Sequence, residues 1–159
     1  MSDSGDPGVR WLSPDEQRAW QDYRQLKRLL DAQLARDLVR DTGLSEADYD
    51  ALSTLTEVDG QRWRASELAA RLEWSTSRLA HHIGRMERRG LVARENCDTD
   101  GRGAMITLTE EGLQTIRRAA PAHVASVRHH FVDRLTPEQL EQLSDIARSV
   151  VDHLPTPRT

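Results

Sequence analysis

The sequence has few of the residues that cross-link a protein or fill a large core. Its 159 residues include one cysteine, Cys97, and one phenylalanine, and only 4% are aromatic. A single cysteine excludes both an internal disulfide and a cysteine-rich zinc site. The hydrophobic fraction is 37%, below the roughly 45–50% of ordinary globular domains. Because such a chain has little apolar material for a large isolated core, we expect a second subunit to supply part of the burial.

Long hydrophobic runs are absent as well. Uninterrupted apolar stretches are only a few residues long, which excludes a membrane-spanning helix. The amino terminus, MSDSGDPGVR, is polar and lacks the apolar segment of a secretory signal. We therefore expect a cytoplasmic protein with no membrane partner.

Charge is distributed unevenly along the chain. The formal net charge of −4 argues at first against a polyanionic partner. Residues 1–60 carry 7 basic and 13 acidic side chains, residues 61–103 carry 9 and 6, and residues 104–159 carry 6 and 7. The middle third is therefore basic, with a net charge of +3. Because a local basic face is enough to attract phosphate, the overall acidity does not exclude nucleic acid.

Strong helix signals lie near both ends of the chain. The segment Ser13-Pro14-Asp15-Glu16 combines an N-cap, a proline at the first helical position and a carboxylate three residues on. It predicts a first helix that runs to about Arg40 and is stopped by Thr42-Gly43. The same combination at Thr136-Pro137-Glu138-Gln139 predicts a last helix that continues through Leu154.

Apolar residues recur every three or four positions in these helices and in a third one, expected from Thr109 to Phe131 with a kink at Pro121. The stripes exceed what the helices of one subunit can bury. We therefore expect residues 13–42 and 109–154 to form the interface of a homodimer. The stripes consist of Trp20, Tyr23, Leu26, Leu30 and Leu34, then of Leu113, Ile116, Ala120, Val124, Val127 and Phe131, and finally of Leu140, Leu143, Ile146, Val150 and Leu154.

The middle of the chain is typical of a helix-turn-helix. Residues 66–72 form a short helical pattern, Glu73-Trp74 makes a turn, and Ser75 is a natural N-cap for a helix that ends at Gly90. A further helix, opened by Ser45 and ended by Asp59-Gly60, is expected before this motif.

The second helix of the motif has one apolar face and one basic, polar face. At about 100° per residue, Leu79, Ile83 and Met86 share the inward face. A major groove accepts one helix, and arginine can bind guanine through two hydrogen bonds, so the opposite face is predicted to contact DNA. The alternative is an ordinary solvated helix face. The opposite face consists of Ser77, His81, Gly84, Arg85 and Arg88, with Arg78 at its edge.

After Gly90 the hydrophobic period changes from helical to alternating. Residues 91–95 and 104–108 are predicted strands, and the connection between them is rich in turn formers, which predicts a hairpin, or wing. Arg102 lies between two glycines at its tip and is well placed for the minor groove, whose negative potential attracts arginine. Asp100 either orients an arginine or is a plain turn residue.

Five short motifs follow one another across the helix-turn-helix and the hairpin. They are Ser-Glu-Leu-Ala at 66–69, Trp-Ser-Thr-Ser-Arg-Leu at 74–79, Arg-Met-Glu-Arg-Arg-Gly-Leu-Val at 85–92, Asp-Gly-Arg-Gly at 100–103 and Leu-Thr-Glu-Glu-Gly at 108–112. In this order they resemble the MarR (multiple-antibiotic-resistance regulator) family. The resemblance implies a mainly α fold with a small β-hairpin wing, a winged helix-turn-helix with N- and C-terminal dimerisation helices.

The resemblance also implies a function. It predicts a homodimeric, sequence-specific transcriptional regulator that binds a pseudo-palindromic operator and acts as a repressor released by a small phenolic or aromatic-acid ligand. By this correspondence Ser75, Ser77, Arg78, His81, Arg85, Asp100 and Arg102 take DNA-contacting positions. The remaining candidates are Thr76 and Arg88 on the same helix for DNA, and Trp20 and Tyr23 on the first helix for the ligand.

The expected organisation is one domain between two short tails. The tails are residues 1–12 and 155–159. Within residues 13–154, the segments 13–42 and 109–154 supply the dimerisation helices, and 45–108 form the DNA-binding lobe.

Other interpretations stay open on the sequence. A winged-helix module that acts on a protein partner would have the same shape but would lack the steep salt dependence of a DNA complex. Cys97 near Arg94 permits a redox-responsive regulator, since a neighbouring arginine favours the reactive thiolate. His123, His129 and His130 lie close together, but no carboxylate or cysteine stands at matching spacing, so we predict no metal and no cofactor. Without a nucleophile and base, or paired carboxylates, we expect no enzyme.

Overall fold

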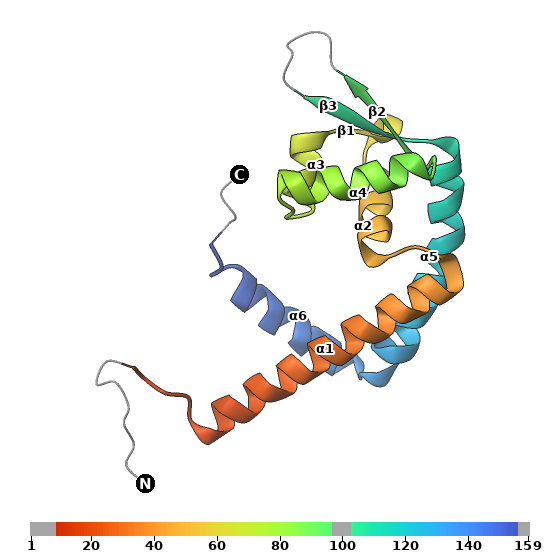
Figure 1. Cartoon of the computed structure of the whole chain (residues 1–159). Coiled ribbons are helices and arrows are strands. Elements are labelled where there is room, and N and C mark those ends of the chain that lie inside the picture. The colour runs from red at the N-terminus through yellow and green to blue at the C-terminus, as the bar shows by residue number, and fades with distance from the viewer. Residues whose placement is uncertain (1–8, 97–102, 156–159) are drawn as a thin grey trace. The chain divides into compact units, whose positions relative to one another are not determined.

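The computed structural model of the chain describes residues 9–96 and 103–155, which form helices and one small sheet (Figure 1). By compactness they divide into two units, the first ending at Gln33 and the second beginning at Leu34. No helix in this part of the chain is long and apolar enough to span a membrane. In chain order the elements are α1 (Pro14–Thr42), α2 (Glu46–Leu55), the 3-10 turn η1 (Asp59–Gln61), β1 (Arg62–Arg64), α3 (Ala65–Arg71), α4 (Thr76–Arg88), β2 (Val92–Asn96), β3 (Ala104–Leu108), α5 (Glu110–His130), η2 (Val132–Arg134) and α6 (Pro137–Val151).

Three helices begin at the capping residues that the sequence predicts. The Glu16 N–H donates to the Ser13 hydroxyl at 3.2 Å, and the Ser13 N–H donates to the Glu16 carboxylate at 2.7 Å. Ser45 at the start of α2 and Thr136 at the start of α6 form the same reciprocal pair of bonds with the residue three positions on. The predicted starts of the first, second and last helices are therefore confirmed.

The ends of the second and the last helix differ from the prediction. The second helix ends at Leu55 rather than at Asp59-Gly60, because the Thr56 N–H already bonds back to the carbonyls of the last turn. Gly60, which was predicted to end this helix, instead lies in η1 with a positive φ of 78°. The last helix ends at Val151 rather than at Leu154, since a residue that precedes a proline, here Pro155, avoids the helical region.

A three-stranded antiparallel sheet has β3 in its centre, with β1 and β2 on either side. The predicted hairpin is confirmed, with Val92 opposite Leu108. The first strand was not predicted, because the alternation of Arg62–Arg64 is too short to distinguish from a loop. It places Trp63 opposite Ile106 on the side of the sheet that faces the core.

The hydrophobic core belongs to the second unit. It is formed by α2, α3, α4, α5 and the sheet, together with the end of α1. Its members are Leu38, Leu44, Ala51, Leu52, Leu55, Leu68, Ala69, Leu79, Ile83, Met86, Leu91, Val92, Ile106, Leu108, Ile116 and Ala119.

The first turn of α5 lies directly against the hairpin. A Cβ atom on Gly112 would lie 2.0 Å from the carbonyl oxygen of Leu91 and 2.8 Å from Cδ1 of Leu108, so only glycine fits there. The Thr109 hydroxyl donates to the carbonyl of Gly90 at 2.6 Å and accepts from the Gly112 N–H at 3.0 Å. These contacts fix the start of α5 to the base of the wing.

A buried carboxylate joins the end of α1 to α5. Asp37 is 4% exposed. The Ser126 hydroxyl donates to its Oδ2 at 2.7 Å, His130 Nε2 lies 2.9 Å from the same oxygen, and Arg40 donates to its Oδ1 at 2.7 Å. The bond from Ser126, followed by the His130 and Arg40 contacts, lowers the pKa of Asp37 to about 2 despite the opposing effect of desolvation.

The Asp37 contacts predict a loss of stability in acid. Below its ordinary pKa of 3.8 the unfolded chain binds a proton on this group, whereas the folded chain does so only near pH 2. The stabilisation is thus present above about pH 4 and is lost as the pH falls towards about 2. We expect Asp37→Asn to unfold more easily than the wild type at about pH 6, with a difference that shrinks on acidification. Urea denaturation of both proteins between about pH 6 and pH 2 measures the difference in their free energies of unfolding. A difference that does not change with pH would contradict the lowered pKa of Asp37.

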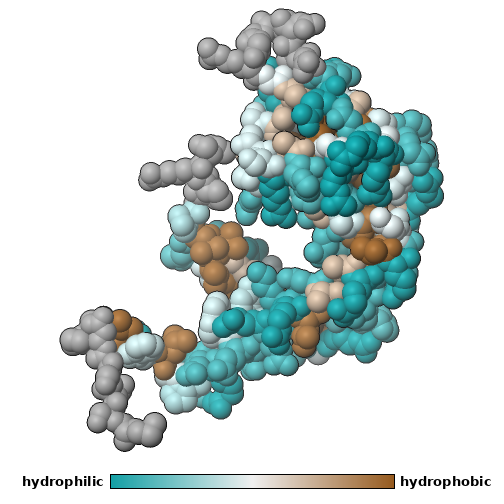
Figure 2. All heavy atoms as spheres, viewed as in Figure 1, coloured by the Kyte–Doolittle hydropathy of each residue, from teal (hydrophilic) through white to brown (hydrophobic). Residues whose placement is uncertain are grey.

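Two helices carry large apolar side chains that the described part of the chain leaves exposed. No residue of α6 is buried; Ile146 is 62% and Val150 is 55% exposed. Figure 2 shows the hydrophobic side chains of α6 at the surface. In the first unit, α1 exposes Trp20 and Tyr23 to a similar degree. Apolar surface of this kind marks a binding or association surface.

Candidate nucleic-acid interface

The helix predicted to contact DNA is α4, and local signals fix both of its ends. The Ser75 hydroxyl accepts a hydrogen bond from the Arg78 N–H at 3.2 Å, which confirms Ser75 as the N-cap. The predicted inward residues are all buried. The helix ends at Arg88, two residues before the predicted Gly90, which instead takes the left-handed conformation after the cap with a φ of 72°.

The turn between α3 and α4 is closed by a residue in the left-handed region. Glu73 has a φ of 55°. Its N–H donates to the carbonyl of Ala70 at 3.1 Å, and the Trp74 N–H donates to the carbonyl of Ala69 at 2.9 Å. These two bonds satisfy carbonyls at the end of α3 and turn the chain sharply into α4. The predicted helix, turn and helix are therefore confirmed.

The face of α4 opposite the core is open and basic. Ser77, His81, Arg85 and Arg88 are all exposed, and a Cβ atom on Gly84 would meet no other heavy atom within 4 Å. Among the residues the structure describes, the guanidinium groups of Arg85 and Arg88 have no ion-pair partner. The structure thus brings the predicted residues together on one exposed surface of α4.

Three further predicted residues lie at the start of this surface. Ser75 and Thr76 are exposed at the N-terminus of α4. Arg78, the predicted edge residue, lies over the ring of Trp74 rather than projecting freely. The open end of a helix attracts phosphate through its free N–H groups, so this end adds to the basic character of the face.

Arg89 has a different role from its two arginine neighbours, and sequence reasoning did not assign it one. It donates to Asp48 at 2.7 Å and to the carbonyl of Gly43 at 3.3 Å. The Asp48 side chain is 3% exposed and also belongs to the capping box of α2. This ion pair joins a buried carboxylate to an exposed arginine, holds the end of α4 against the start of α2 and so helps to set the direction in which the exposed face points.

The wing is described only at its base. The strands β2 and β3 pair over five residues each. Arg62 reaches from β1 to Glu95 on β2 at 2.6 Å and braces the sheet across β3. Asp100, Arg102 and Cys97, with the roles predicted for them, lie outside the described residues.

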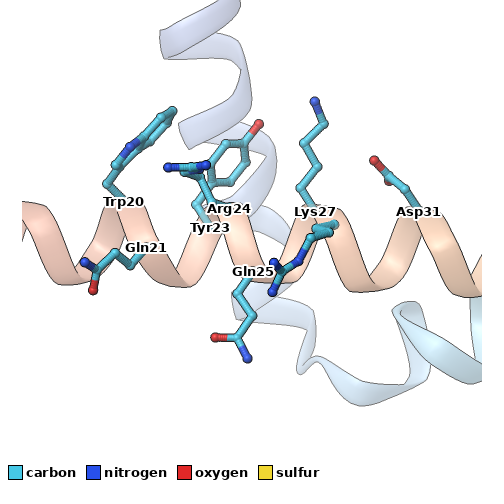
Figure 3. Close-up of a pocket in the computed structure, with 8 residues that line it drawn as sticks. Trp20, Gln21, Tyr23, Arg24, Gln25, Lys27 and Asp31 are labelled. Atoms are coloured by element: carbon cyan, nitrogen blue, oxygen red, sulfur yellow. The ribbon is translucent and has the colours of Figure 1, made fainter.

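The candidate ligand residues lie on one side of α1 (Figure 3). The rings of Trp20 and Tyr23 stack with centroids 5.7 Å apart and planes 28° from parallel. With Lys27 and Asp31, which point to the same side in Figure 3, they line a hollow of about 690 Å³. All its lining residues come from this one helix.

The histidines pack and form hydrogen bonds. His123 contacts Tyr49 with ring centroids 4.4 Å apart, and His130 bonds to Asp37. In residues 9–96 and 103–155 no group of three or more histidine, cysteine or acidic side chains could hold a metal ion. Although Ser126, His130 and Asp37 meet, serine and histidine bond to the same carboxylate oxygen, so they do not form a nucleophile activated by a base.

Comparison with known proteins gives one consistent result. The model of the MarR family matches residues 42–103, from the end of α1 into the wing. The structure of AbsC, a MarR family transcriptional regulator from Streptomyces coelicolor, is 47% identical with a TM-score of 0.86 and covers 91% of this chain and 97% of that one.

Two further proteins extend the comparison. Sco3205, a MarR family regulator from Streptomyces coelicolor whose structure is a complex with DNA, is 42% identical with a TM-score of 0.88, over 94% of this chain and 93% of that one. Transcriptional repressor MprA of Escherichia coli (strain K12) is 26% identical over 74% of this chain. The chain spans 66% of the length of MprA.

Proposed function

The chain belongs to the MarR family of transcriptional regulators, and from this premise we propose that it is a homodimeric repressor that binds a pseudo-palindromic DNA site. The observation that carries the proposal is the open basic face of α4. This face follows a tight turn and precedes a wing, and its Arg85 and Arg88 are exposed without an ion-pair partner in residues 9–96 and 103–155, so they can reach base edges and phosphates. The 42% identical Sco3205 was crystallised with DNA, and MprA is named a repressor; both names support this proposal.

The homodimer is supported by exposed apolar surface. The α6 helix has no buried residue and exposes Leu143, Ile146, Val150 and Val151. A lone subunit would leave these side chains in water, whereas a second copy would cover them. In a twofold dimer the two α4 helices would enter successive major grooves about 34 Å apart, which demands half-sites at matching spacing.

Release by an aromatic acid is the regulatory part of the proposal. The Trp20 and Tyr23 rings offer a stacking surface, and Lys27 beside them offers a positive charge for a carboxylate or phenolate. One helix cannot enclose a ligand, so a second chain would have to complete the pocket. A ligand that prefers a dimer with misplaced α4 helices would lower DNA affinity.

Selection from a random pool of DNA duplexes tests the function. We expect the purified protein to enrich one pseudo-palindromic sequence and to bind a scrambled duplex at least about a thousandfold more weakly. Affinity for the selected duplex should also fall steeply as salt rises. Equal binding of selected and scrambled DNA would refute sequence-specific regulation. A thermal-shift screen with aromatic acids then tests the ligand, with benzoate-type compounds as the first probes.

A further inference from the structure

Trp74 lies in the turn just before α4 and contacts two side chains of that helix. The guanidinium carbon of Arg78 lies 4.5 Å from the centroid of the Trp74 ring. The His82 ring lies 5.1 Å from it, with planes 45° apart. Arg78 and His82 are one helical turn apart and lie on one side of α4, and the ring of Trp74, which precedes the helix, contacts both.

The Trp74 ring is held in place independently of these two partners. Its backbone N–H closes the turn to Ala69, as described above. Its side chain is half-buried and packs against the hydrophobic core. The ring is therefore a fixed surface, whereas the Arg78 side chain is exposed and lies on it.

Of the two side chains that contact Trp74, Arg78 carries the positive charge and His82 does not. Burial is the main cause that lowers the pKa of His82, and the nearby charges of His81 and Arg78 lower it further, so His82 is neutral at pH 7. Arg78 is thus the cation of this pair on the Trp74 ring. Burial raises the pKa of the Asp50 carboxyl on α2, and the charges of His123 and then Arg78 oppose the rise.

We propose that Trp74 is a positioning residue for DNA recognition: its ring holds the Arg78 guanidinium at the edge of the α4 face in the orientation that contacts DNA. The inference rests on the proposed function. An arginine free in solution must be ordered when it binds, and this ordering weakens the complex. A guanidinium already stacked on an indole has lost much of that freedom and keeps its donors at the edge of the ring plane.

A double-mutant cycle on DNA affinity tests the proposal. The four proteins are the wild type, Trp74→Leu, Arg78→Gln and the double variant, each titrated with the duplex that the wild type selects. We expect Trp74→Leu to weaken binding about three- to thirtyfold in the wild-type background. In the Arg78→Gln background the same change should weaken binding less than about twofold, because the group it positions is already gone.

The conservative variant Trp74→Phe separates positioning from packing. It keeps an aromatic face under Arg78 and should bind within about threefold of the wild type. Equal losses from Trp74→Leu in both backgrounds, or a Phe variant as weak as the Leu variant, would overturn the proposal. If the wild type itself selects no sequence, the proposed function fails instead.

A measurement on the unaltered protein covers the case in which Trp74→Leu does not fold. The side-chain protons of Arg78 should show an upfield ring-current shift in the NMR spectrum of the free protein. We expect no such shift for Arg88, which lies over no aromatic ring in the part of the chain that the structure describes and serves as the internal reference. An Arg78 signal at the position of Arg88 would show that the stack does not form in solution and would overturn the proposal.

Discussion

Replacing Arg85 and Arg88 together with glutamate is expected to weaken specific DNA binding by at least about a hundredfold, since each arginine contact with a base or phosphate is worth about 1–3 kcal/mol. Each change also reverses a charge that would face the DNA in the proposed complex. Both side chains are exposed and make no ion pair among the described residues, so the melting temperature should change little. Fluorescence anisotropy with the selected duplex at several salt concentrations measures both the affinity and its salt dependence.

The matched control is Arg117→Glu on the exposed surface of α5, which makes the same charge change as each of the single variants Arg85→Glu and Arg88→Glu. If the effect came from net charge alone, the control and either single α4 variant would lose affinity equally. We expect the control to stay within about threefold of the wild type and the salt slope to fall by about one for each phosphate contact that α4 loses. A double variant that still discriminates selected from scrambled DNA would remove α4 from the interface.

Local signals in the sequence account for most of the fold. Ser45 and Ser75 cap helices because their hydroxyls satisfy N–H groups within three residues, so the information lies in the sequence itself. The spacing of Leu79, Ile83 and Met86 is also visible in the sequence, and it predicts the inward side of α4. Their burial confirms this side and leaves the opposite side exposed. The candidate interface was therefore predictable before any tertiary contact was known.

Contacts between distant residues were not predictable in this way. Asp48 and Arg89 are 41 positions apart, and nothing in either local pattern distinguishes this arginine from Arg88 beside it. The burial of Asp37 was also not predictable from the sequence, because a carboxylate on a helix is ordinarily expected to be exposed to solvent. Its burial follows from the position of Ser126 and His130 on α5, 89 and 93 residues away.

Trp74 and Arg78 form an intermediate case. Their four-residue spacing was visible in the sequence, yet Trp74 precedes the helix, where the spacing rule does not hold by itself. The left-handed Glu73 makes the turn before Trp74, and core packing of the Trp74 ring contributes to its position next to Arg78. Neither the turn conformation nor the packing can be seen in the spacing alone.

Placing a charge on the exposed side of α6 is expected to break the dimer and, with it, tight DNA binding. The variant is Ile146→Asp with Val150→Asp, one helical turn apart on the same side. Neither side chain is buried within the subunit, so the subunit should keep its helical content by circular dichroism. In the proposed dimer both would lie in the interface, where an unpaired carboxylate is strongly unfavourable.

Two measurements separate the possible outcomes. Sedimentation at micromolar concentration should give the 18.0 kDa monomer for the variant and twice that mass for the wild type. Affinity for the full palindrome should fall by about 10²- to 10⁴-fold, because a monomer loses the high effective concentration of its second half-site. The control is Arg148→Asp, which changes an exposed charge on the side of α6 opposite Ile146 and Val150 and should stay dimeric. A wild-type mass for the double variant would place the interface away from α6, whereas a monomer that still binds the palindrome tightly would show that recognition needs only one α4 helix.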